Sequence, residues 1–327
     1  MSELLEIKNL KVDLMSTRGI VRALSQVDLT IRKGEILGLV GESGCGKSMT
    51  SKAVMGLLPT KRSRVSGEIL FQGEDLLKLP KKRLQALRGN RISLIFQDPM
   101  TSLNPLMTVG QQLGEVFRLH EKCSKQEARE KSMELLEKVG IYPPAKRVDQ
   151  YPHELSGGLQ QRVMIAIAIA NNPDLLIADE PTTALDVTIQ AQILDLLQNL
   201  QKDLGMSILL ITHNFGVVAE VCDRVAVMYA GRVMETADTH TIFQNPGHPY
   251  SKALIESIPQ PGGNQEYLTT IPGSPPELFA VQKDCPYAPR CGYADSACET
   301  LPNMRRCGDT PDHIAACHHL QCRQGGK

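Results

Sequence analysis

The stretch GESGCGKS, residues 41–48, constrains the fold of this chain more than any other feature. It fits the pattern G-x-x-x-x-G-K-[ST], follows the apolar run EILGLV (35–40) and opens KSMTSKAVMGLL (47–58), which has helical spacing. A strand–loop–helix unit of this kind turns backbone N–H groups and a helix N-terminus toward a phosphate. The sequence therefore predicts a phosphate-binding loop in an α/β fold, with a chance Gly-rich turn as the alternative.

The side chains of this loop have separate expected roles. Lys47 would reach the β- and γ-phosphates of a nucleotide, and the Ser48 hydroxyl would bind Mg²⁺. The other predicted nucleotide contacts come from the loop and the first helical turn, namely Gly41, Ser43, Gly44, Cys45, Gly46 and Met49.

Strands and helices alternate along the chain. Residues 1–40 alternate apolar and polar side chains and predict antiparallel strands, whereas the pattern from 98 to 172 is helical. Alternation of strands with helices after residue 173 indicates a mostly parallel sheet with helices on both faces. We expect an ATPase-type core with an antiparallel β subdomain (1–97 and 173–240), a helical subdomain (98–172) and a C-terminal extension with a cysteine cluster (241–327).

The run LLIADE, residues 175–180, predicts an apolar strand that ends in two carboxylates. Asp179 would hold Mg²⁺ through its shell, and Glu180 would orient or deprotonate the attacking water. The alternative is a strand that ends in a solvated acidic turn.

The run LSGGLQQR, residues 155–162, predicts a second anion site. Ser156, Gly157 and Gly158 stand where a helix should begin, with exposed amides and a hydroxyl at its N-terminus. A plain helix cap is the alternative, and IAIAIA could be a strand on periodicity alone.

The motifs GESGCGKS, Gln97, LSGGLQQR, LLIADE, ALD (184–186) and THN occur in the order that resembles the nucleotide-binding subunit of ABC transporters. The resemblance covers residues 1 to about 235. It implies ATP and Mg²⁺ as ligands and a head-to-tail dimer that sandwiches two ATPs. In that dimer Ser156, Gly157 and Gly158 serve the γ-phosphate bound across the interface.

The same resemblance implies the catalytic set Glu180, His213 and Gln97. Gln97 would contact Mg²⁺ and the water, completing a Mg²⁺ set with Ser48 and Asp179, and would relay to the membrane subunit. His213 would grip the γ-phosphate beside Glu180, although an isolated His at a strand end can also be a capped, solvated imidazole. Asp186 would lie in the dimer-contact loop.

The adenine contact departs from the family pattern. Such subunits usually stack the base on an aromatic residue about 25 positions before the phosphate loop, but this chain has no Phe, Tyr or Trp before Phe71. Arg18, Arg22 or Val21 would cover the ring instead, because a guanidinium plane can also stack.

Two segments, FQDPMTSLNPLMTVGQQ (96–112) and FQNPGHPYSKALIESIP (243–259), are similar to segments of oligopeptide, dipeptide and nickel importer ATPases, with the dipeptide importers most similar. The resemblance implies a second homologous ATPase subunit, two transmembrane permease subunits and, indirectly, a periplasmic solute-binding protein. The expected place is the cytoplasmic face of the inner membrane. The solute would be a di- or oligopeptide or haem or its precursors, with nickel or another small solute as the alternative.

Composition excludes several other classes. Lys and Arg number 36, as do Asp and Glu, so a large nucleic-acid footprint is not expected. The N-terminal charges argue against a signal peptide, and the longest apolar runs fall short of the ~18–20 residues that span a bilayer. An ABC-type ATPase of DNA or ribosomes would usually show long coiled-coil insertions or two cassettes, and a non-catalytic subunit would lack Glu180 or His213.

The C-terminal cysteines have the spacing Cys285-x₅-Cys291-x₆-Cys298-x₁₈-Cys317. Four thiolates separated by such loops suit an iron–sulfur cluster, and the family resemblance also implies a [4Fe–4S] cluster. A zinc site and a metal-free tail are the alternatives. Cys307 and Cys322 are extra cysteines, and Cys307 is a rival to any one of the four ligands. We expect reduced thiols, and a tail that braces the partner's tail without touching ATP.

Overall fold

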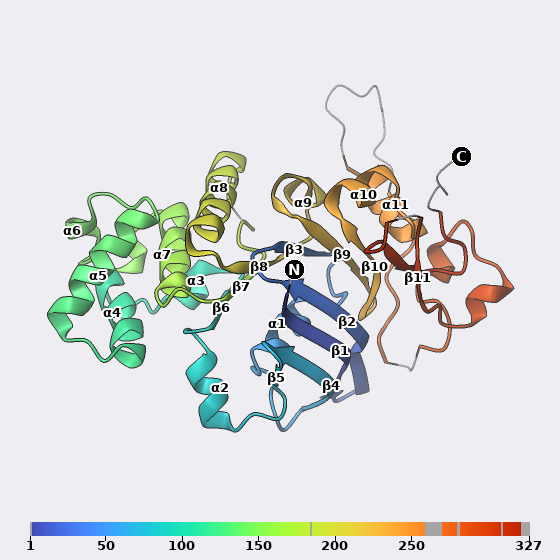
Figure 1. Cartoon of the computed structure of the whole chain (residues 1–327), viewed down its shortest axis with the longest axis horizontal. Coiled ribbons are helices and arrows are strands. Elements are labelled where there is room, and N and C mark those ends of the chain that lie inside the picture. Colours follow the sequence, from blue (N-terminus) through green and yellow to red (C-terminus); the bar gives the residue numbers. More distant parts are fainter. Residues whose placement is uncertain (1, 184, 259–269, 280–281, 309, 322–327) are drawn as a thin grey trace. The chain divides into compact units, whose positions relative to one another are not determined.

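The computed structural model describes residues 2–183, 185–258, 270–279, 282–308 and 310–321 of the chain (Figure 1). The chain forms two compact units, each treated separately below. The first unit contains the segments up to Leu77 and from Ile211 onward, and the second runs from Lys78 to Leu210. The division falls inside strand β8 (Ser207–Thr212).

An antiparallel sheet opens the first unit, in the order β2-β1-β4-β5. The long strands β1 (Glu3–Ser16) and β2 (Gly19–Arg32) pair antiparallel, and β4 (Ser63–Phe71) and β5 (Glu74–Asp75) follow on the other side of β1. Alternate apolar side chains of β1 are buried, which explains why the pattern of the sequence indicated strands. The predicted antiparallel β subdomain is confirmed.

A second sheet in the first unit carries the phosphate loop. Its strands follow the order β11-β12-β10-β9-β3, and β3 (Ile36–Val40) is buried along its whole length. Strand β9 (Arg224–Tyr229) is parallel to β3 and antiparallel to β10 (Arg232–Asp238). The cysteine-rich tail adds β12 (Ile314–Ala316) and β11 (Met304–Arg306) beside β10, a pairing that the sequence did not predict.

The helical segments of the first unit are α1 (Lys47–Val54), α9 (Phe215–Val221), α10 (Thr239–Gln244), α11 (Pro249–Glu256) and the short 3₁₀ turns η2 (Ala288–Arg290) and η3 (Ser296–Glu299). Helix α1 ends four residues earlier than the spacing of 47–58 predicts, because Gly56 follows with a positive φ of 58°.

The second unit contains β7 (Leu175–Asp179), which has the parallel strand β6 (Ile92–Ile95) on one side and β8 on the other. All five residues of β7 are buried, as the uninterrupted apolar run LLIA indicated. Helix α8 (Val187–Leu204) follows β7 and begins at Asp186, whose side chain accepts from the Ile189 N–H at 2.9 Å.

The helices of residues 98–172 gather together, drawn in green in Figure 1. Helices α4 (Val109–His120) and α5 (Lys125–Lys138) each begin with a capping box, which defines their start. Helix α7 (Gly157–Ile169) includes IAIAIA, so the strand alternative for that run is wrong; the helix is buried around most of its circumference. The other short helical segments of the second unit are α2 (Lys81–Leu87), α3 (Pro99–Ser102), α6 (Pro144–Arg147) and the 3₁₀ turn η1 (Pro152–Glu154).

None of the helices in the described part of the chain is both long and apolar enough to cross a membrane.

Candidate nucleotide site and cysteine cluster

The phosphate loop lies between β3 and α1 in the first unit, as predicted. Its backbone requires glycine: Gly41 and Gly46 have φ values of 152° and 110°. A Cβ atom at Gly41 would lie 2.1 Å from the Met228 carbonyl oxygen, and one at Gly46 would lie 2.7 Å from Leu24 Cδ2. The loop therefore keeps its amides close to the sheet only because no side chains stand at these two positions.

Lys47 is held inside the loop. Its Nζ donates to the carbonyl oxygens of Gly41, at 2.7 Å, and Glu42, at 3.0 Å. Helix α1 begins at Lys47, and the residue before it, Gly46, has no side chain that could cap the first turn. The N–H groups of this turn and the positive end of the helix dipole can therefore bind an anion. Ser48 and Met49 are the next residues of the same turn.

Cys45 is a buried side chain of the same loop. Burial raises the pKa of its thiol, and the nearby Lys47 ammonium offsets only part of that effect. The Cys45 carbonyl oxygen accepts from the Gly231 N–H at 2.8 Å, so this residue ties the loop to the turn between β9 and β10. Cys45 is thus a packing residue in its protonated form.

Glu180 and Gln97 come together in the second unit. The Gln97 Nε2 amide donates to Glu180 Oε2 at 3.0 Å, and the Thr183 hydroxyl donates to the same oxygen at 2.9 Å. Glu180 directly follows β7 and has a φ of 50°, a conformation that is uncommon for a residue with a side chain. Asp179 is buried at the end of the strand. Strained backbone of this kind is concentrated at functional sites, where surrounding contacts hold it.

The predicted second anion site lies at the start of α7. Ser156 is the N-cap, with an extended backbone, and Gly157 and Gly158 form the first turn. A Cβ atom at Gly158 would lie 3.0 Å from Ile189 Cγ2 on α8, so glycine allows the two helices to pack closely. Gln160 donates to the Leu155 carbonyl oxygen at 3.2 Å and thereby fixes the chain that leads into the helix.

His213 follows β8, is exposed, and belongs to the first unit together with the phosphate loop. Gln97, Asp179, Glu180 and the segment Ser156–Gly158 belong to the second unit. Within the second unit the structure pairs Gln97 with Glu180. The meeting of His213 and the phosphate loop with these groups stays a prediction.

Of the predicted adenine contacts, Val21 and Arg22 lie in β2 and Arg18 precedes it. The Arg22 Nε atom lies 4.0 Å from Asp13 Oδ1, and the backbone N–H of Arg22 donates to the Leu278 carbonyl oxygen at 2.7 Å. Arg18 is exposed in the β1–β2 turn. Stacking of the base on Arg18, Val21 or Arg22 stays a prediction.

The four predicted cluster ligands are free thiols in one region of the first unit. Cys285, Cys298 and Cys317 are buried, and Cys291 is half-buried. Burial raises the pKa of the Cys317 thiol to about 11, and the neighbouring thiols Cys285, Cys291 and Cys298 add to this rise. The Cys285 N–H donates to the Cys298 carbonyl oxygen at 2.9 Å, so the backbones of these two residues are neighbours.

The donor set fits a thiolate-bound metal group. The Tyr293 N–H points at the Cys291 sulfur at 3.4 Å, and the His319 N–H points at the Cys317 sulfur at 3.2 Å. Hydrogen bonds from backbone amides to sulfur are a recurring feature around iron–sulfur clusters and tune their potential. Burial raises the pKa of the Cys285, Cys291 and Cys317 thiols, and a bound cation would stabilise them as thiolates.

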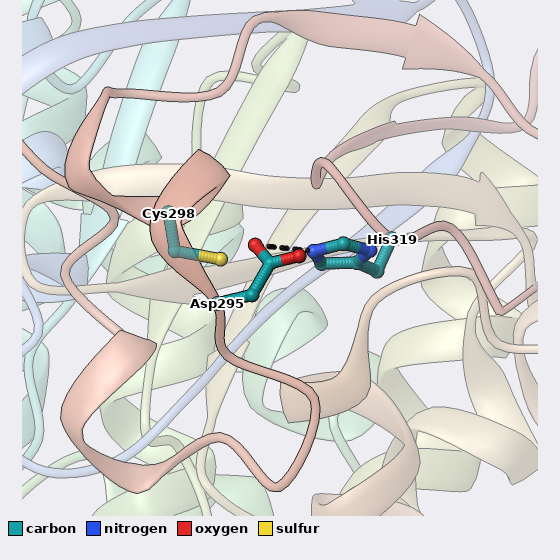
Figure 2. Close-up of side chains that lie close together, drawn as sticks. All are labelled: Asp295, Cys298 and His319. Carbon is teal, nitrogen blue, oxygen red and sulfur yellow. Dashed lines mark hydrogen bonds and ion pairs between the residues drawn. The ribbon is translucent and has the colours of Figure 1, made fainter.

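Asp295 and His319 are potential ligands that the sequence reasoning missed. Among the described residues, Asp295, Cys298 and His319 offer ligand atoms that all lie within 4.8 Å of one another (Figure 2). His319 Nε2 lies 2.9 Å from Asp295 Oδ1, and this partner lowers the pKa of the Asp295 carboxyl. The set supplies one nitrogen, one oxygen and one sulfur, which suits a single zinc ion. Zinc at this trio and a cluster on the four thiols would compete for Cys298.

Cys307 is disulfide-bonded, so it is not available as a rival ligand in this structure. Its sulfur packs on Gly247, where an added Cβ atom would lie 2.3 Å from it. The expectation that the tail contains only reduced thiols is therefore wrong for Cys307. Cys322 lies outside the described residues.

The tail also reaches the phosphate loop, which the sequence reasoning did not foresee. The Arg290 guanidinium forms an ion pair with Glu42 at 2.6 Å. Glu42 is the second residue of that loop, and the expectation that the tail does not touch ATP stays a prediction. No local sequence signal links residues 248 positions apart.

Comparisons with known proteins agree with these features. A family model described as ABC transporter matches residues 24–183, and one described as the C-terminal region of oligopeptide/dipeptide transporters matches residues 234–298. The chain is 50% identical to the oligopeptide transport ATP-binding protein OppD of Haemophilus influenzae, over 93% of this chain and 94% of that protein. It is also 50% identical to the dipeptide transport ATP-binding protein DppD of Bacillus subtilis, over 92% and 90% of the two chains.

A solved structure extends the comparison to the fold. The ATP-binding cassette MJ0796, in a dimeric post-hydrolysis state bound to ADP and Pi, matches with a TM-score of 0.65 and 28% identity. The match covers 72% of this chain and 98% of that one. The predicted fold class, an ABC-type α/β core with an antiparallel β subdomain, is confirmed.

Proposed function

Because the chain belongs to the family of ABC transporter ATP-binding proteins that serve oligopeptide and dipeptide import, we propose that it binds and hydrolyses ATP to drive uptake of such peptides. The observation that carries this proposal is the Glu180 carboxylate, held by Gln97 and Thr183 at the end of an apolar strand. A carboxylate fixed in this way can accept a proton from a water molecule.

The residues divide the work of hydrolysis among them. Lys47 and the amides of the phosphate loop hold the β- and γ-phosphates. The oxygen donors Ser48, Gln97 and Asp179 suit Mg²⁺, which neutralises the charge of the phosphates when it is bound. Glu180 takes the proton of the attacking water, and His213 contacts the γ-phosphate.

The signature segment acts on the nucleotide of a neighbouring chain. Ser156, Gly157 and Gly158 place a hydroxyl and the N-terminus of α7 at one surface of the second unit. In a head-to-tail dimer this surface contacts the γ-phosphate in the partner's site, and Asp186 lies at the dimer contact. The similar cassette solved as a dimer supports this arrangement. The partner is a second homologous ATPase subunit.

A pocket in the second unit supports docking to membrane subunits. It has a volume of about 670 Å³ and is lined in part by Leu106, Met107, Thr108 and Gln111, which belong to the segment that follows Gln97. Leu106 is 84% exposed, although it is a large apolar side chain. A short helix from a permease subunit would cover it. The chain then sits at the cytoplasmic face of the inner membrane beneath two permeases, with a periplasmic solute-binding protein acting indirectly and no nucleic acid involved.

The finer identity of the solute is also a proposal. The sequence favours the dipeptide branch and its subunit DppD, whereas similar relatives carry both oligopeptide and dipeptide names. Haem or its precursors and nickel are the alternatives. The solute does not touch this subunit, so peptide length has to be measured directly.

The C-terminal extension holds a [4Fe–4S] cluster on Cys285, Cys291, Cys298 and Cys317 in this proposal. Four free thiols, a backbone hydrogen bond between Cys285 and Cys298, and two amide N–H groups aimed at sulfur support it. A single zinc ion on Asp295, Cys298 and His319 is the competing assignment. The predicted domain boundaries at residues 97, 172 and 240 also stay a prediction.

Uptake by cells that lack only this chain tests the function. Uptake of a labelled dipeptide and a labelled longer peptide should fall, and the wild-type chain should restore it. Lys47→Ala should not restore it, because the loop loses its phosphate contact. Lys52→Ala, an exposed lysine of the same helix, is the matched control and should restore it. Uptake restored by Lys47→Ala would contradict the proposal, and the peptide that depends on the chain identifies its branch.

A further inference from the structure

Arg290, a residue of the cysteine-rich tail, contacts the phosphate loop through two hydrogen bonds. Arg290 Nη1 donates to Glu42 Oε2 at 2.6 Å, and Nη2 donates to Glu42 Oε1 at 3.0 Å. The pairing is bidentate, the arrangement in which a guanidinium and a carboxylate fix each other's orientation. Both residues belong to the first unit.

Further hydrogen bonds hold the guanidinium group in this position. Its Nη1 also donates to the Tyr229 hydroxyl at 3.2 Å, and its Nε donates to the Pro272 carbonyl oxygen at 2.8 Å. The Arg290 side chain is 4% exposed, compared with 25% for Glu42. Removal of one partner from an ion pair as buried as this leaves the other charge without compensation.

Glu42 is in turn anchored at three points. Its N–H donates to the Tyr250 hydroxyl at 3.0 Å, its carbonyl oxygen accepts from Lys47 Nζ at 3.0 Å, and its carboxylate accepts from Arg290. Lys47 is the residue that would bind the β- and γ-phosphates. Arg290 therefore holds the same loop residue that orients the phosphate-binding lysine.

The two sides of this contact also share a buried aromatic cluster. The ring centroids of Tyr229 and Tyr250 lie 4.6 Å apart, and Tyr287 of the tail lies 5.5 Å from Tyr229 and 5.2 Å from Tyr250. All three residues are buried. The tail is thus packed against the support of the loop, and Arg290 is its direct link to the loop.

Two cysteines flank the turn that carries Arg290. The Ala288 N–H donates to the Cys285 carbonyl oxygen at 3.0 Å, and the Cys291 N–H donates to the Ala288 carbonyl oxygen at 3.2 Å. A ligand bound to Cys285 and Cys291 would hold both ends of this short turn. Loss of that ligand would loosen the segment between them.

We propose that Arg290 is a positioning residue for the phosphate loop, through which the state of the cysteine-rich tail sets the affinity of the chain for ATP. When Glu42 is paired with Arg290, the loop is already ordered for nucleotide binding. When this ion pair is lost, part of the binding free energy is used to order the loop, and the affinity for ATP falls. This inference rests on the ATP binding proposed above.

Equilibrium binding of a fluorescent ATP analogue to the purified full chain tests the proposal. Arg290→Gln should raise the Kd by about 5- to 150-fold, the range typical of coupling between two sites. Glu42→Gln should raise it similarly, and the double variant should be no weaker than either single one, because both changes remove one interaction. Cys291→Ser should raise the Kd in the wild-type background and have no further effect in the Arg290→Gln background.

Arg224→Gln is the matched control. Arg224 Nη1 bonds both oxygens of Glu35, at 3.1 and 3.2 Å, and their side chains are 12% and 6% exposed in the same unit. This variant should lower the thermal unfolding midpoint as Arg290→Gln does, yet leave the Kd for the ATP analogue unchanged. The comparison separates positioning of the loop from general stability.

Several results would overturn the inference. A wild-type Kd for Arg290→Gln would do so, as would an equal rise for Arg224→Gln, or independent, additive effects of Glu42→Gln and Arg290→Gln. An equal effect of Cys291→Ser in both backgrounds would remove the link to the cysteines. These outcomes leave the ATPase proposal intact, provided that the wild-type chain binds the analogue and Lys47→Ala does not. Absence of binding by the wild-type chain would overturn both.

Discussion

Glu235 shows how single buried polar residues join the C-terminal tail to the sheet. This carboxylate on β10 is completely buried, and it accepts from the N–H groups of Gly247, at 2.6 Å, and His248, at 2.9 Å. The His313 ring of the tail lies 2.7 Å from it. A buried carboxylate with three partners is well satisfied, and loss of any one partner would leave it costly to bury.

The buried imidazole of His248 predicts how the stability of the chain depends on pH. Burial lowers the pKa of its imidazole to about 4, although Glu235 acts in the opposite direction. The unfolded chain protonates this residue near pH 6.5, so between about pH 6.5 and pH 4 the unfolded state binds more protons. The free energy of unfolding should therefore fall with decreasing pH, and this residue should contribute a loss of about 2 kcal/mol between pH 7 and pH 5.

Urea unfolding at pH 7 and pH 5 measures this loss. Nδ1 of His248 accepts from the Tyr250 N–H at 2.9 Å, and an asparagine can offer an acceptor in its place. His248→Asn should lower stability at pH 7 but lose less of it at pH 5 than the wild type does. An equal loss in both proteins would show that His248 does not titrate in this way.

At the scale of elements, the sequence predicted the regular structure where local signals were strong. β7 is a short apolar run beside acidic residues, and α4 and α5 begin with capping boxes, so each element's pattern agrees with its environment. Strands β11 and β12 could not be predicted, because they have three residues each, and β12 forms by pairing with distant β10 while β11 pairs with β12. The run IAIAIA lies in helix α7, which is buried on most sides. Apolar residues therefore occur at nearly every position, and the sequence lacks the periodicity that distinguishes a helix from a strand.

The cysteine-rich element supplies a prediction about metal content. Protein purified without oxygen should be brown and contain about four irons per chain, as expected for one cluster on four thiolates. Cys298→Ser should bleach it, because a ligand is lost. Asp295→Ala should leave the colour unchanged, since a carboxylate is not needed for a four-thiolate cluster.

Colourless protein with one zinc ion per chain would refute the iron–sulfur assignment. Sensitivity of that zinc to Asp295→Ala and His319→Ala would then place the ion on Asp295, Cys298 and His319. Metal analysis of the same three variants thus decides between the two sets of ligands.

At the scale of the whole molecule, the sequence predicted the residues of the nucleotide site better than the contacts between residues that are distant in the chain. The phosphate loop, the strand that ends at Glu180 and the start of α7 each follow from a motif with a local physical reason, whereas Gln97 came only from the family resemblance. Arg290 could not be predicted, because its partner Glu42 is brought to it only by the fold. The same holds for Asp295 and His319, which lie 24 positions apart in the chain.

Two compact units divide the proposed catalytic residues between them. Lys47, Ser48 and His213 belong to the first, and Asp179 and Glu180 belong to the second. Hydrolysis in our account requires that both groups act on one ATP, and Glu180 is the member whose only expected task is activation of water. Its replacement by glutamine therefore separates nucleotide binding from chemistry.

The most direct test measures phosphate release and ATP retention by the assembled transporter, counted per nucleotide bound to this chain. Glu180→Gln should lower the rate by about 10²–10⁴-fold, as expected for loss of a general base, while ATP stays bound. Glu134→Gln, an exposed glutamate of α5 in the same unit, should hydrolyse ATP as the wild type does. Near wild-type phosphate release by Glu180→Gln would contradict the account, because the carboxylate held by Gln97 and Thr183 would then not be the base.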